Sequence, residues 1–206
     1  MSPGDPGATY DRAYFDHWYR DQGFGSRAVL RRKVAYAVAA AEYLLARPLR
    51  SVLDVGCGEG PWQPVLADLR PRATYVGVDP SSYAVERFGA RRHLRLGAFG
   101  ELGRAVPAEE GPFDLIVCVD VLGYVEDADV APGLAAIAAR LGGVALIEVF
   151  TAEDQFEGDV EHYRARPSAR YERWFADARL ARLGPNLFVG RALRPVLSTL
   201  EGPLGP

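Results

Sequence analysis

Short apolar runs alternate with helical segments along most of this 206-residue chain. Most of these runs are almost continuously apolar, which is typical of parallel strands that are buried on both faces. The predicted strands are 51–55, 73–78, 93–96, 113–119 and 144–150, and the predicted helices between them are about 62–70, 81–88, 100–105 and 130–140. This alternation predicts an α/β fold in which helices cover a parallel sheet.

Further elements are predicted on both sides of this alternation. An aromatic and charged segment at 9–22 favours a short helix, and 27–46 favours a longer one. The apolar stripe of the longer helix is formed by Val29, Val34, Val38, Ala41 and Leu45. A helix at 168–178 precedes two short apolar runs separated by Gly184-Pro185-Asn186, which predicts an antiparallel hairpin. We divide the chain into a tail and aromatic lid segment (1–26), one domain (27–193) and a C-terminal tail (194–206).

Composition narrows the class of protein. The chain is 49% hydrophobic and 25% charged, with a net charge of −3, so it lacks the basic surplus expected of a nucleic-acid binder. No apolar stretch approaches the roughly 20 residues of a membrane span. Cys57 and Cys118 are expected to be free thiols. We therefore expect a cytoplasmic monomer or homodimer with a small-molecule substrate, and with neither a nucleic acid nor a membrane as partner. No pair of His or Cys residues has ligand spacing, so no metal is expected.

A predicted buried strand at 51–55 runs into the glycine-rich turn Gly56-Cys57-Gly58-Glu59-Gly60. Glycines at such a junction let the backbone pass close to a ligand at the helix N-terminus. A dinucleotide-binding fingerprint, G-x-G-x-x-G, would require its third glycine at position 61, which is Pro61. The turn therefore favours a ligand other than a dinucleotide.

The next predicted strand ends in Asp79, 23 residues after Gly56. A carboxylate there can accept hydrogen bonds from both hydroxyls of a ribose. We expect this carboxylate to be poorly satisfied when no ligand is bound, so that Asp79→Ala weakens cofactor affinity with little loss of folding. Ser81 is expected to cap the following helix.

The spacing Gly56-x-Gly58-x-Gly60, with Asp54 two residues ahead, is similar to the first motif of class I S-adenosylmethionine-dependent methyltransferases. The resemblance covers about residues 30–190, with order and spacing intact. It implies a Rossmann-like, doubly wound, mostly parallel seven-stranded sheet with a C-terminal antiparallel hairpin strand and helices on both faces. It also implies S-adenosylmethionine as cofactor, with Asp54 facing the positively charged amino end of its methionine moiety.

The resemblance also extends to the loops. Phe113–Leu122 resembles the family's fourth strand and the loop that passes under the cofactor. Gly97-Ala98-Phe99 occupies the place where the family commonly has an acidic residue next to the adenine, so we expect backbone groups of Ala98 and Phe99 to serve there, with Phe99 beside the ring. The expected cofactor-binding residues are Asp54, Gly56, Cys57, Gly58, Asp79, Pro80, Ala98, Phe99, Asp120 and Val121.

Candidate substrate and catalytic residues come from several segments of the chain. In a helix over 10–19, Asp11, Tyr14, Phe15 and Trp18 share one face with His17 at its flank, and this face would form either a lid or plain core. Tyr124 follows Gly123 where family members often have a Glu-His pair, and Phe156 lies in a long polar segment after the fifth strand. The expected lid and substrate residues are Tyr14, Trp18, Tyr124 and Phe156, and the expected catalytic residues are Glu148, His17 and His162. For Glu148 a buried ion pair and a substrate contact are equally compatible with its place in an apolar run.

The sequence thus predicts an enzyme that methylates a small molecule by direct displacement. Many such reactions need only alignment and exclusion of water, so a base is optional. Three alternatives stay open: an S-adenosylmethionine-binding enzyme of other chemistry, such as cyclisation or aminopropyl transfer; a dinucleotide-dependent oxidoreductase; and a non-catalytic partner subunit.

Overall fold

The computed structural model describes residues 10–21, 26–155, 158–190 and 193. Its seven strands form one sheet in the order β3-β2-β1-β4-β5-β7-β6. The strands are β1 (Ser51–Val55), β2 (Thr74–Asp79), β3 (Leu94–Leu96), β4 (Phe113–Val119), β5 (Leu141–Glu148), β6 (Ala181–Gly184) and β7 (Leu187–Val189). Only β7 runs antiparallel to its neighbours β5 and β6, while the other neighbouring pairs are parallel. The predicted fold, including its C-terminal hairpin, is confirmed.

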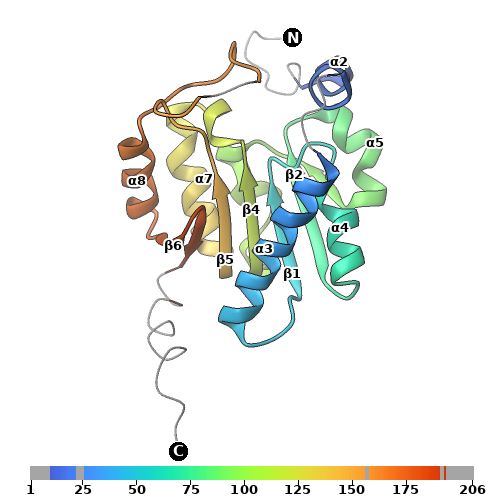
Figure 1. Cartoon of the computed structure of the whole chain (residues 1–206), viewed down its shortest axis with the longest axis vertical. Helices are drawn as coiled ribbons and strands as arrows, with labels where there is room; N and C mark the ends of the chain where they lie inside the picture. Colours follow the sequence, from blue (N-terminus) through green and yellow to red (C-terminus); the bar gives the residue numbers. More distant parts are fainter. Residues whose placement is uncertain (1–9, 22–25, 156–157, 191–192, 194–206) are drawn as a thin grey trace, which may run out of the picture.

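Helices cover both faces of this sheet (Figure 1). The helices are α2 (Arg12–Phe15), continued by a π-helical segment η1 (Asp16–Asp21), α3 (Arg27–Leu45), α4 (Trp62–Leu69), α5 (Ser82–Arg92), α6 (Leu102–Ala105), α7 (Asp127–Arg140) and α8 (Ser168–Asp177), with 3₁₀ turns η2 (Phe99–Glu101), η3 (Ala108–Glu110) and η4 (Leu122–Tyr124). One apolar core lies between the sheet and α3, α4 and α5, and a second lies between the sheet and α6, α7 and α8. Alternate residues of each strand enter opposite cores, as Val52 and Leu53 of β1 do.

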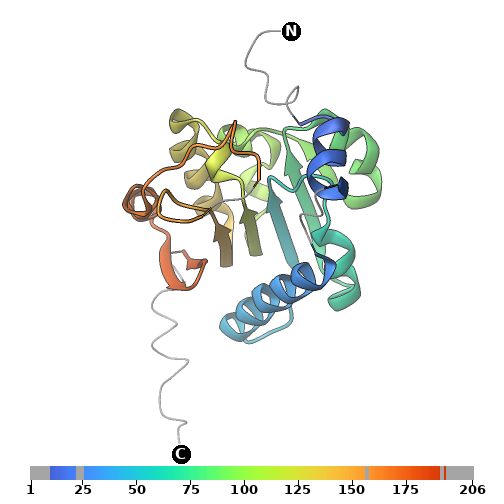
Figure 2. The ribbon, with the colours of Figure 1, turned by 45° about the horizontal axis from the view of Figure 1, so that its top comes forward.

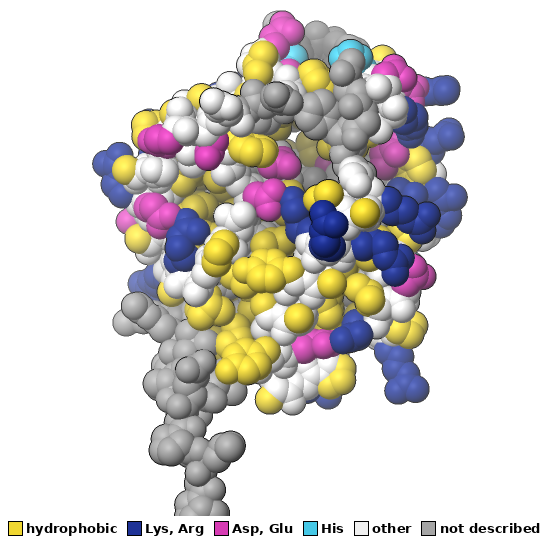
Figure 3. Space-filling view, in the orientation of Figure 1, with side chains coloured by type: hydrophobic (Ala, Val, Ile, Leu, Met, Phe, Trp, Pro, Cys, Tyr) yellow, Lys and Arg dark blue, Asp and Glu magenta, His cyan; other side chains and the backbone are white. Residues whose placement is uncertain are grey.

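The apolar face of α3 differs from the predicted stripe at its two ends. Val34, Val38 and Ala41 are buried as predicted, but Val29 is exposed and Leu45 is only half-buried. Val29 lies in the first turn of the helix and lines a cavity instead of entering the core. Figure 3 shows hydrophobic side chains exposed over α3, which include Tyr36 and Tyr43.

Two segments far apart in sequence lie over the carboxyl edge of the parallel strands. One contains α2 and η1, and the other follows β5 and leads to α8 (Figures 1 and 2). The termini of the strands and these two segments enclose the site described below. In the described part of the chain, no helix is long and apolar enough to cross a membrane.

Strand β5 begins three residues earlier than predicted, because Gly142 and Gly143 belong to the strand and not to a turn before it. A β-carbon on Gly143 would overlap the backbone carbonyl of Asp114 on β4, so only glycine fits this close approach. By contrast, a β-carbon on Gly184 of β6 would meet no atom within 4 Å.

We therefore expect Gly143→Ala to lower the melting temperature by about 2–12 °C, because overpacking of this kind costs about 1–3 kcal/mol. Gly184→Ala is the matched control and should melt within about 1 °C of the wild type, since a surface change away from any contact costs little. Circular dichroism melts of both variants measure the difference. Equal melting temperatures would contradict the close approach of β4 and β5 at Gly143.

Candidate functional site

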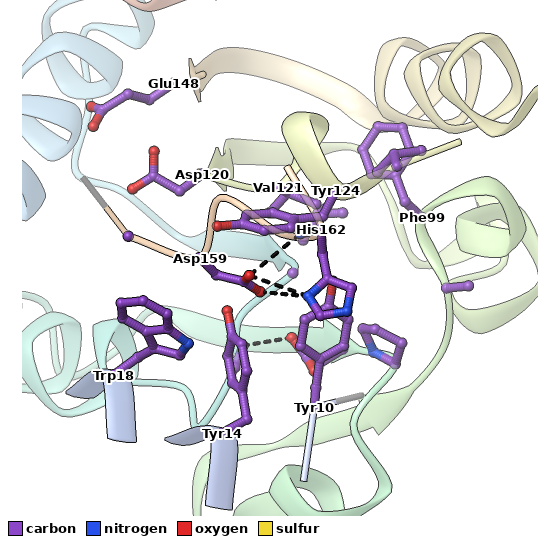
Figure 4. Close-up of a pocket in the computed structure, with 18 of the residues that line it drawn as sticks. Tyr10, Tyr14, Trp18, Phe99, Asp120, Val121, Tyr124, Glu148, Asp159 and His162 are labelled. Atoms are coloured by element: carbon purple, nitrogen blue, oxygen red, sulfur yellow. Dashed lines mark hydrogen bonds and ion pairs between the residues drawn. The ribbon is translucent and has the colours of Figure 1, made fainter. Parts of the chain in front are cut away.

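A cavity of about 860 Å³ opens at the carboxyl edge of the sheet. Its floor is formed by the ends of β1, β2, β4 and β5, and its upper wall by the segment around α2 and the loop after β5. A volume of this size is ample for a drug-sized ligand, and the position is where open α/β sheets bind ligands. Figure 4 shows ten of the residues around it with labels.

The glycine-rich turn after β1 provides a backbone cradle on the cavity floor. Gly56, Gly58 and Gly60 have φ values of +70°, +54° and +71°, which favour glycine. The amide N–H of Gly56 donates to the carbonyl of Val78 at 2.8 Å, which fixes the turn to the end of β2. A β-carbon on Gly56 would overlap Val121, and one on Gly58 would lie 3.2 Å from Phe15. Gly56 and Gly58 line the cavity as predicted, and so does Val121.

Asp79 holds this turn from the end of β2. Its Oδ2 accepts from the amide N–H of Gly58 at 2.6 Å, and its Oδ1 accepts from the amide N–H of Ser81 at 2.9 Å. The expectation that this carboxylate is poorly satisfied without ligand is therefore wrong, since two backbone donors satisfy it. Burial raises the pKa of Asp79 to about 6, although these two hydrogen bonds lower it. Asp79 and Pro80 both line the cavity, and Ser81 caps α5 as expected, accepting from Ala84 N–H.

The structure does not bring Asp54 or Cys57 to the cavity wall. Asp54 lies two residues after Val52, so the alternation along β1 directs it into the core beneath α3 and α4. There its Oδ2 accepts from the Tyr75 hydroxyl at 2.7 Å, and burial raises its pKa to about 7. Burial likewise raises the pKa of the Cys57 thiol. Both residues support the turn from below, and the predicted direct contact of Asp54 with the cofactor is not what this geometry offers.

One end of the cavity lies beside the termini of β2 and β3. Ala98 and Phe99 line it as predicted, together with Val78, Gly97 and Gly100. The Phe99 ring is only 7% exposed, because it packs against Gly133 of α7. Phe99 thus borders this end of the cavity, and its place beside the adenine ring stays a prediction.

The opposite wall is aromatic. Tyr14, Trp18 and Tyr124 line it as predicted, together with Tyr10 and Tyr19. Tyr10 meets Tyr14 and Tyr124 edge to face, at ring-centroid distances of 5.1 and 6.4 Å. Burial, with smaller contributions from Asp159 and Asp79, raises the pKa of Tyr10 to about 12. Burial raises the pKa of Tyr14 and Tyr124 as well. These phenols are therefore neutral hydrogen-bond donors at neutral pH.

The aromatic side chains of residues 10–19 lie partly in the apolar core and partly in the cavity wall. The sequence had left a lid and plain core as alternatives for this segment. Phe15 is 4% exposed and packs beside Tyr83, whereas Tyr14 and Trp18 face the cavity. Asp11 does not share that face; its Oδ1 caps α2 by accepting from Tyr14 N–H at 2.9 Å. His17 stacks edge-on against Trp18 and does not line the cavity, so the structure does not support its predicted catalytic role.

His162 does line the cavity, and it is held by a residue that the sequence did not single out. Its Nδ1 lies 3.1 Å from Oδ2 of Asp159, whose side chain is 8% exposed. Figure 4 shows this pair facing each other next to Tyr10 and Tyr14. The spacing Asp159-x-x-His162 is visible in the sequence, and it is the signal that could have identified Asp159. Phe156, predicted for the same loop, lies outside the described residues.

A second charged group lies across the cavity from this pair (Figure 4). Lys33, the single lysine of the chain, donates from Nζ to Oε1 of Glu148 at 2.6 Å, and both residues line the cavity. Glu148 therefore has an ion-pair partner, although both side chains are partly exposed, at 25% for Lys33 and 24% for Glu148. Its contact with a substrate stays a prediction. Asp120 lines the cavity beside them, and burial and then the charge of Glu148 raise its pKa to about 6 against the opposing effect of Lys33. No group of three residues that could hold a metal ion occurs in the described ranges.

Comparison with solved structures identifies the fold class. The chain is similar to DesVI of Streptomyces venezuelae (TM-score 0.65, 17% identity, 86% of this chain and 97% of that one). It is also similar to a SAM-dependent methyltransferase of Archaeoglobus fulgidus (TM-score 0.61, 14% identity, 79% and 73%). A third similar structure is CalS10 of Micromonospora echinaspora, an amino pentose methyltransferase with SAM bound (TM-score 0.59, 18% identity, 82% and 92%). At these identities the likeness establishes a shared Rossmann-like methyltransferase fold.

The family follows from the sequence comparison. Residues 19–198 match the model of a methyltransferase domain family, and the chain belongs to that family. A protein of Synechococcus sp. is 34% identical over 114 residues, which make up 52% of this chain and 26% of that protein. The chain thus aligns with about a quarter of the length of this relative. The resemblance predicted from the Asp54–Gly60 motif is confirmed.

The residues present fit S-adenosylmethionine, because the cavity joins an open glycine cradle to a buried carboxylate at the end of β2. We expect the affinity for its demethylated product, S-adenosylhomocysteine, to fall below about pH 6, where Asp79 becomes protonated and loses acceptor capacity. Calorimetric titrations between pH 5 and 8 measure this. Asp79→Asn should weaken binding and flatten the pH dependence, while Asp120→Asn should leave the pH dependence in place.

Asp79→Asn should also lower the melting temperature, since one of the two backbone donors at Gly58 and Ser81 loses its acceptor. This replaces the expectation that Asp79 can be changed with little loss of folding. An Asp79→Asn variant with wild-type affinity at every pH would remove Asp79 from the ligand site.

Proposed function

We propose that this protein transfers the methyl group of S-adenosylmethionine to a hydroxyl group of a small molecule with an aromatic or otherwise flat apolar face. The observation that carries the proposal is the Asp159–His162 pair, which borders the aromatic half of a cavity whose other half holds the glycine cradle and Asp79. When bound, S-adenosylmethionine supplies an electrophilic methyl group whose leaving group is a neutral thioether.

The charge of the cavity supports a cationic ligand. Six acidic residues and two basic ones line it in the described part of the chain: Asp79, Asp120, Glu126, Asp129, Glu148 and Asp159, with Lys33 and Arg164. An excess of acidic groups in a cleft favours a positively charged ligand over an anionic one such as a dinucleotide. Gly56 and Gly58 would hold the methionine moiety along the backbone, and Asp79 would accept from the ribose hydroxyls.

His162 is suited to act as general base toward the acceptor. Because Nδ1 is turned to Asp159, Nε2 is left to take the proton of an acceptor hydroxyl as its oxygen attacks the methyl carbon. The proton then resides on the imidazole, and the buried Asp159 carboxylate stabilises the cation that forms. A carboxylate that fixes the ring and its tautomer in this way favours proton abstraction over a purely structural role.

The aromatic wall would orient the acceptor. Tyr10, Tyr14 and Tyr124 are protonated at neutral pH, so their hydroxyls can donate to oxygen atoms of the acceptor. Their rings and that of Trp18 offer faces and edges to an apolar ring and exclude water from the methyl group.

An amine acceptor is the second candidate, because aromatic rings and carboxylates also bind ammonium groups and because the similar CalS10 is an amino pentose methyltransferase. Methyl release from labelled S-adenosylmethionine against matched panels of phenols, aliphatic alcohols and primary amines separates the two candidates. We expect turnover on hydroxyl compounds. Turnover confined to amines would replace this proposal with the second candidate.

His162→Gln should lower kcat by about 10²–10⁴-fold while the affinity for S-adenosylhomocysteine stays within about twofold, because a base acts on the acceptor and not on the cofactor. Asp159→Asn should lower kcat less and shift the pH–rate profile, since the ring loses its anionic partner. His17→Gln is the matched control and should keep wild-type kcat, because His17 does not line the cavity. A wild-type kcat for His162→Gln would show that the reaction needs no base there.

Trp18→Ala should lower kcat/KM by about three- to tenfold, because the acceptor loses an aromatic contact and water enters the cavity. The exposed Tyr43 of α3 gives the control, and Tyr43→Ala should change neither kcat nor KM. Steady-state kinetics of both variants, with thermal melts to monitor folding, measure the effect. If Trp18→Ala keeps its kcat/KM, the segment around α2 is no lid.

A further inference from the structure

Arg166 is a buried arginine that the proposed mechanism does not use. It is 5% exposed and lies near the end of the loop that leads from β5 to α8. Burying a guanidinium group is costly unless its N–H groups find acceptors. Nη1 donates to the backbone carbonyl of Leu122 at 2.8 Å, Nη2 to that of Val125 at 2.6 Å, and Nε to Oδ1 of Asp127 at 2.8 Å. The planar guanidinium group therefore joins this loop to η4 and to the first turn of α7.

Two further contacts hold the same loop against η4. The backbone N–H of Arg164 donates to the carbonyl of Gly123 at 2.8 Å. The Tyr163 ring lies where Gly123 has no side chain, since a β-carbon there would overlap the ring. Tyr163 also meets Tyr124 edge to face, with 5.2 Å between the ring centroids. Three backbone carbonyls in and just after η4 therefore accept hydrogen bonds from this loop.

The two joined segments carry two sides of the proposed acceptor space. Tyr124 of η4 belongs to the aromatic wall, and the loop carries the Asp159–His162 pair. Figure 4 shows Tyr124 and His162 at the same cavity. Only three residues lie between His162 and Arg166, so the point at which Arg166 is held limits where the imidazole can lie. This placement matters because a reacting group displaced by about 1 Å can cost about 10²-fold in rate.

We propose that Arg166 is a positioning residue for methyl transfer. It fixes the loop after β5 on η4, so that His162 lies at a set distance from an acceptor held by Tyr124. Arg166 does not line the cavity, so it acts through His162 and touches no ligand. This inference rests on the proposed role of His162 as a base. The competing role is purely structural: Arg166 also lies over the Trp174 ring of α8, so it could stabilise the packing of α7 and α8 alone.

Arg170 gives a matched control, because it shares the contacts of Arg166 that do not involve η4. It pairs with Asp127, as Arg166 does. It also lies over the Trp174 ring, at 4.9 Å from the centroid compared with 5.4 Å for Arg166. Arg170→Met therefore removes a guanidinium group from the same acid and the same indole, and it leaves the hydrogen bonds from the loop to η4 in place.

The first measurement is hydrogen exchange of the backbone amides, which does not depend on activity. Arg166→Met should raise the exchange rate of the Arg164 amide by about tenfold or more, because this amide loses its hold on Gly123 when the loop leaves η4. Arg170→Met should leave that rate within about twofold of the wild type. Wild-type protection in Arg166→Met would overturn the proposal. If Arg166→Met does not fold, Arg166→Lys takes its place, since one ammonium group cannot replace the three-point contact of the guanidinium. Wild-type protection in Arg166→Lys would then overturn the proposal.

The second measurement is a double-mutant cycle in kcat, run below the melting temperature of every variant. Arg166→Met should lower kcat about ten- to hundredfold and leave the affinity for S-adenosylhomocysteine within about twofold. In the His162→Gln background the same change should lower kcat by about twofold or less, because the group that Arg166 positions is gone. Equal factors in both backgrounds, or a wild-type kcat for Arg166→Met, would overturn the proposal in favour of the structural role. The cycle uses whichever acceptor the enzyme methylates, so turnover confined to amines would refute the proposed function and leave this test intact.

Discussion

The buried carboxylate of Asp79 connects the parts of the cavity to one another. It accepts from Gly58 of the glycine turn and from Ser81 at the start of α5, so the ends of β1 and β2 are fixed together. The Ser81 hydroxyl in turn donates to the backbone carbonyl of Tyr10 at 2.5 Å, which ties the N-terminal aromatic segment to the same point. The cofactor cradle and the wall that faces the acceptor are therefore positioned through one short chain of hydrogen bonds. Because its two oxygens already accept from the backbone, Asp79 is pre-oriented for a ligand.

Electrostatics divides the cavity into two functional halves. Burial raises the pKa of Asp79 and Asp120 to about 6, so both carboxylates are ionised at neutral pH. Their pKa values nevertheless lie close to the pH of the solution. A cationic ligand would favour their ionised forms, and this coupling makes the floor of the cavity selective for positive charge. The aromatic wall is electrically neutral, because phenols are protonated at neutral pH, and burial raises the pKa of Tyr14 and Tyr124 further. In the proposed function, charge recognition thus serves the cofactor, while apolar contact and the Asp159–His162 pair serve the acceptor.

The fold could be predicted from the sequence because buried parallel strands leave a local signal, a short apolar run, and the glycine spacing marks the cradle. The face onto which a strand-end residue points was harder to predict, and Asp54 was misplaced for that reason. A residue whose role depends on a partner far away in the sequence leaves no local signal. The ion pair of Lys33 and Glu148 is an example, because the two residues are 115 positions apart. Val29 was assigned to the core because its helical spacing fits the apolar stripe, and the sequence does not show that the first turn of α3 lies at the cavity.

The most direct test of the two-part cavity is a crystal structure of the protein with S-adenosylhomocysteine. We expect the ribose hydroxyls to lie within hydrogen-bond distance of the Asp79 carboxylate and the amino acid part to follow Gly56 and Gly58. The sulfur atom should face the space bordered by Tyr14, Tyr124 and His162, where an acceptor would meet the methyl group. A ligand bound elsewhere, or one whose sulfur is turned away from His162 and closed off from that space, would contradict the two-part cavity.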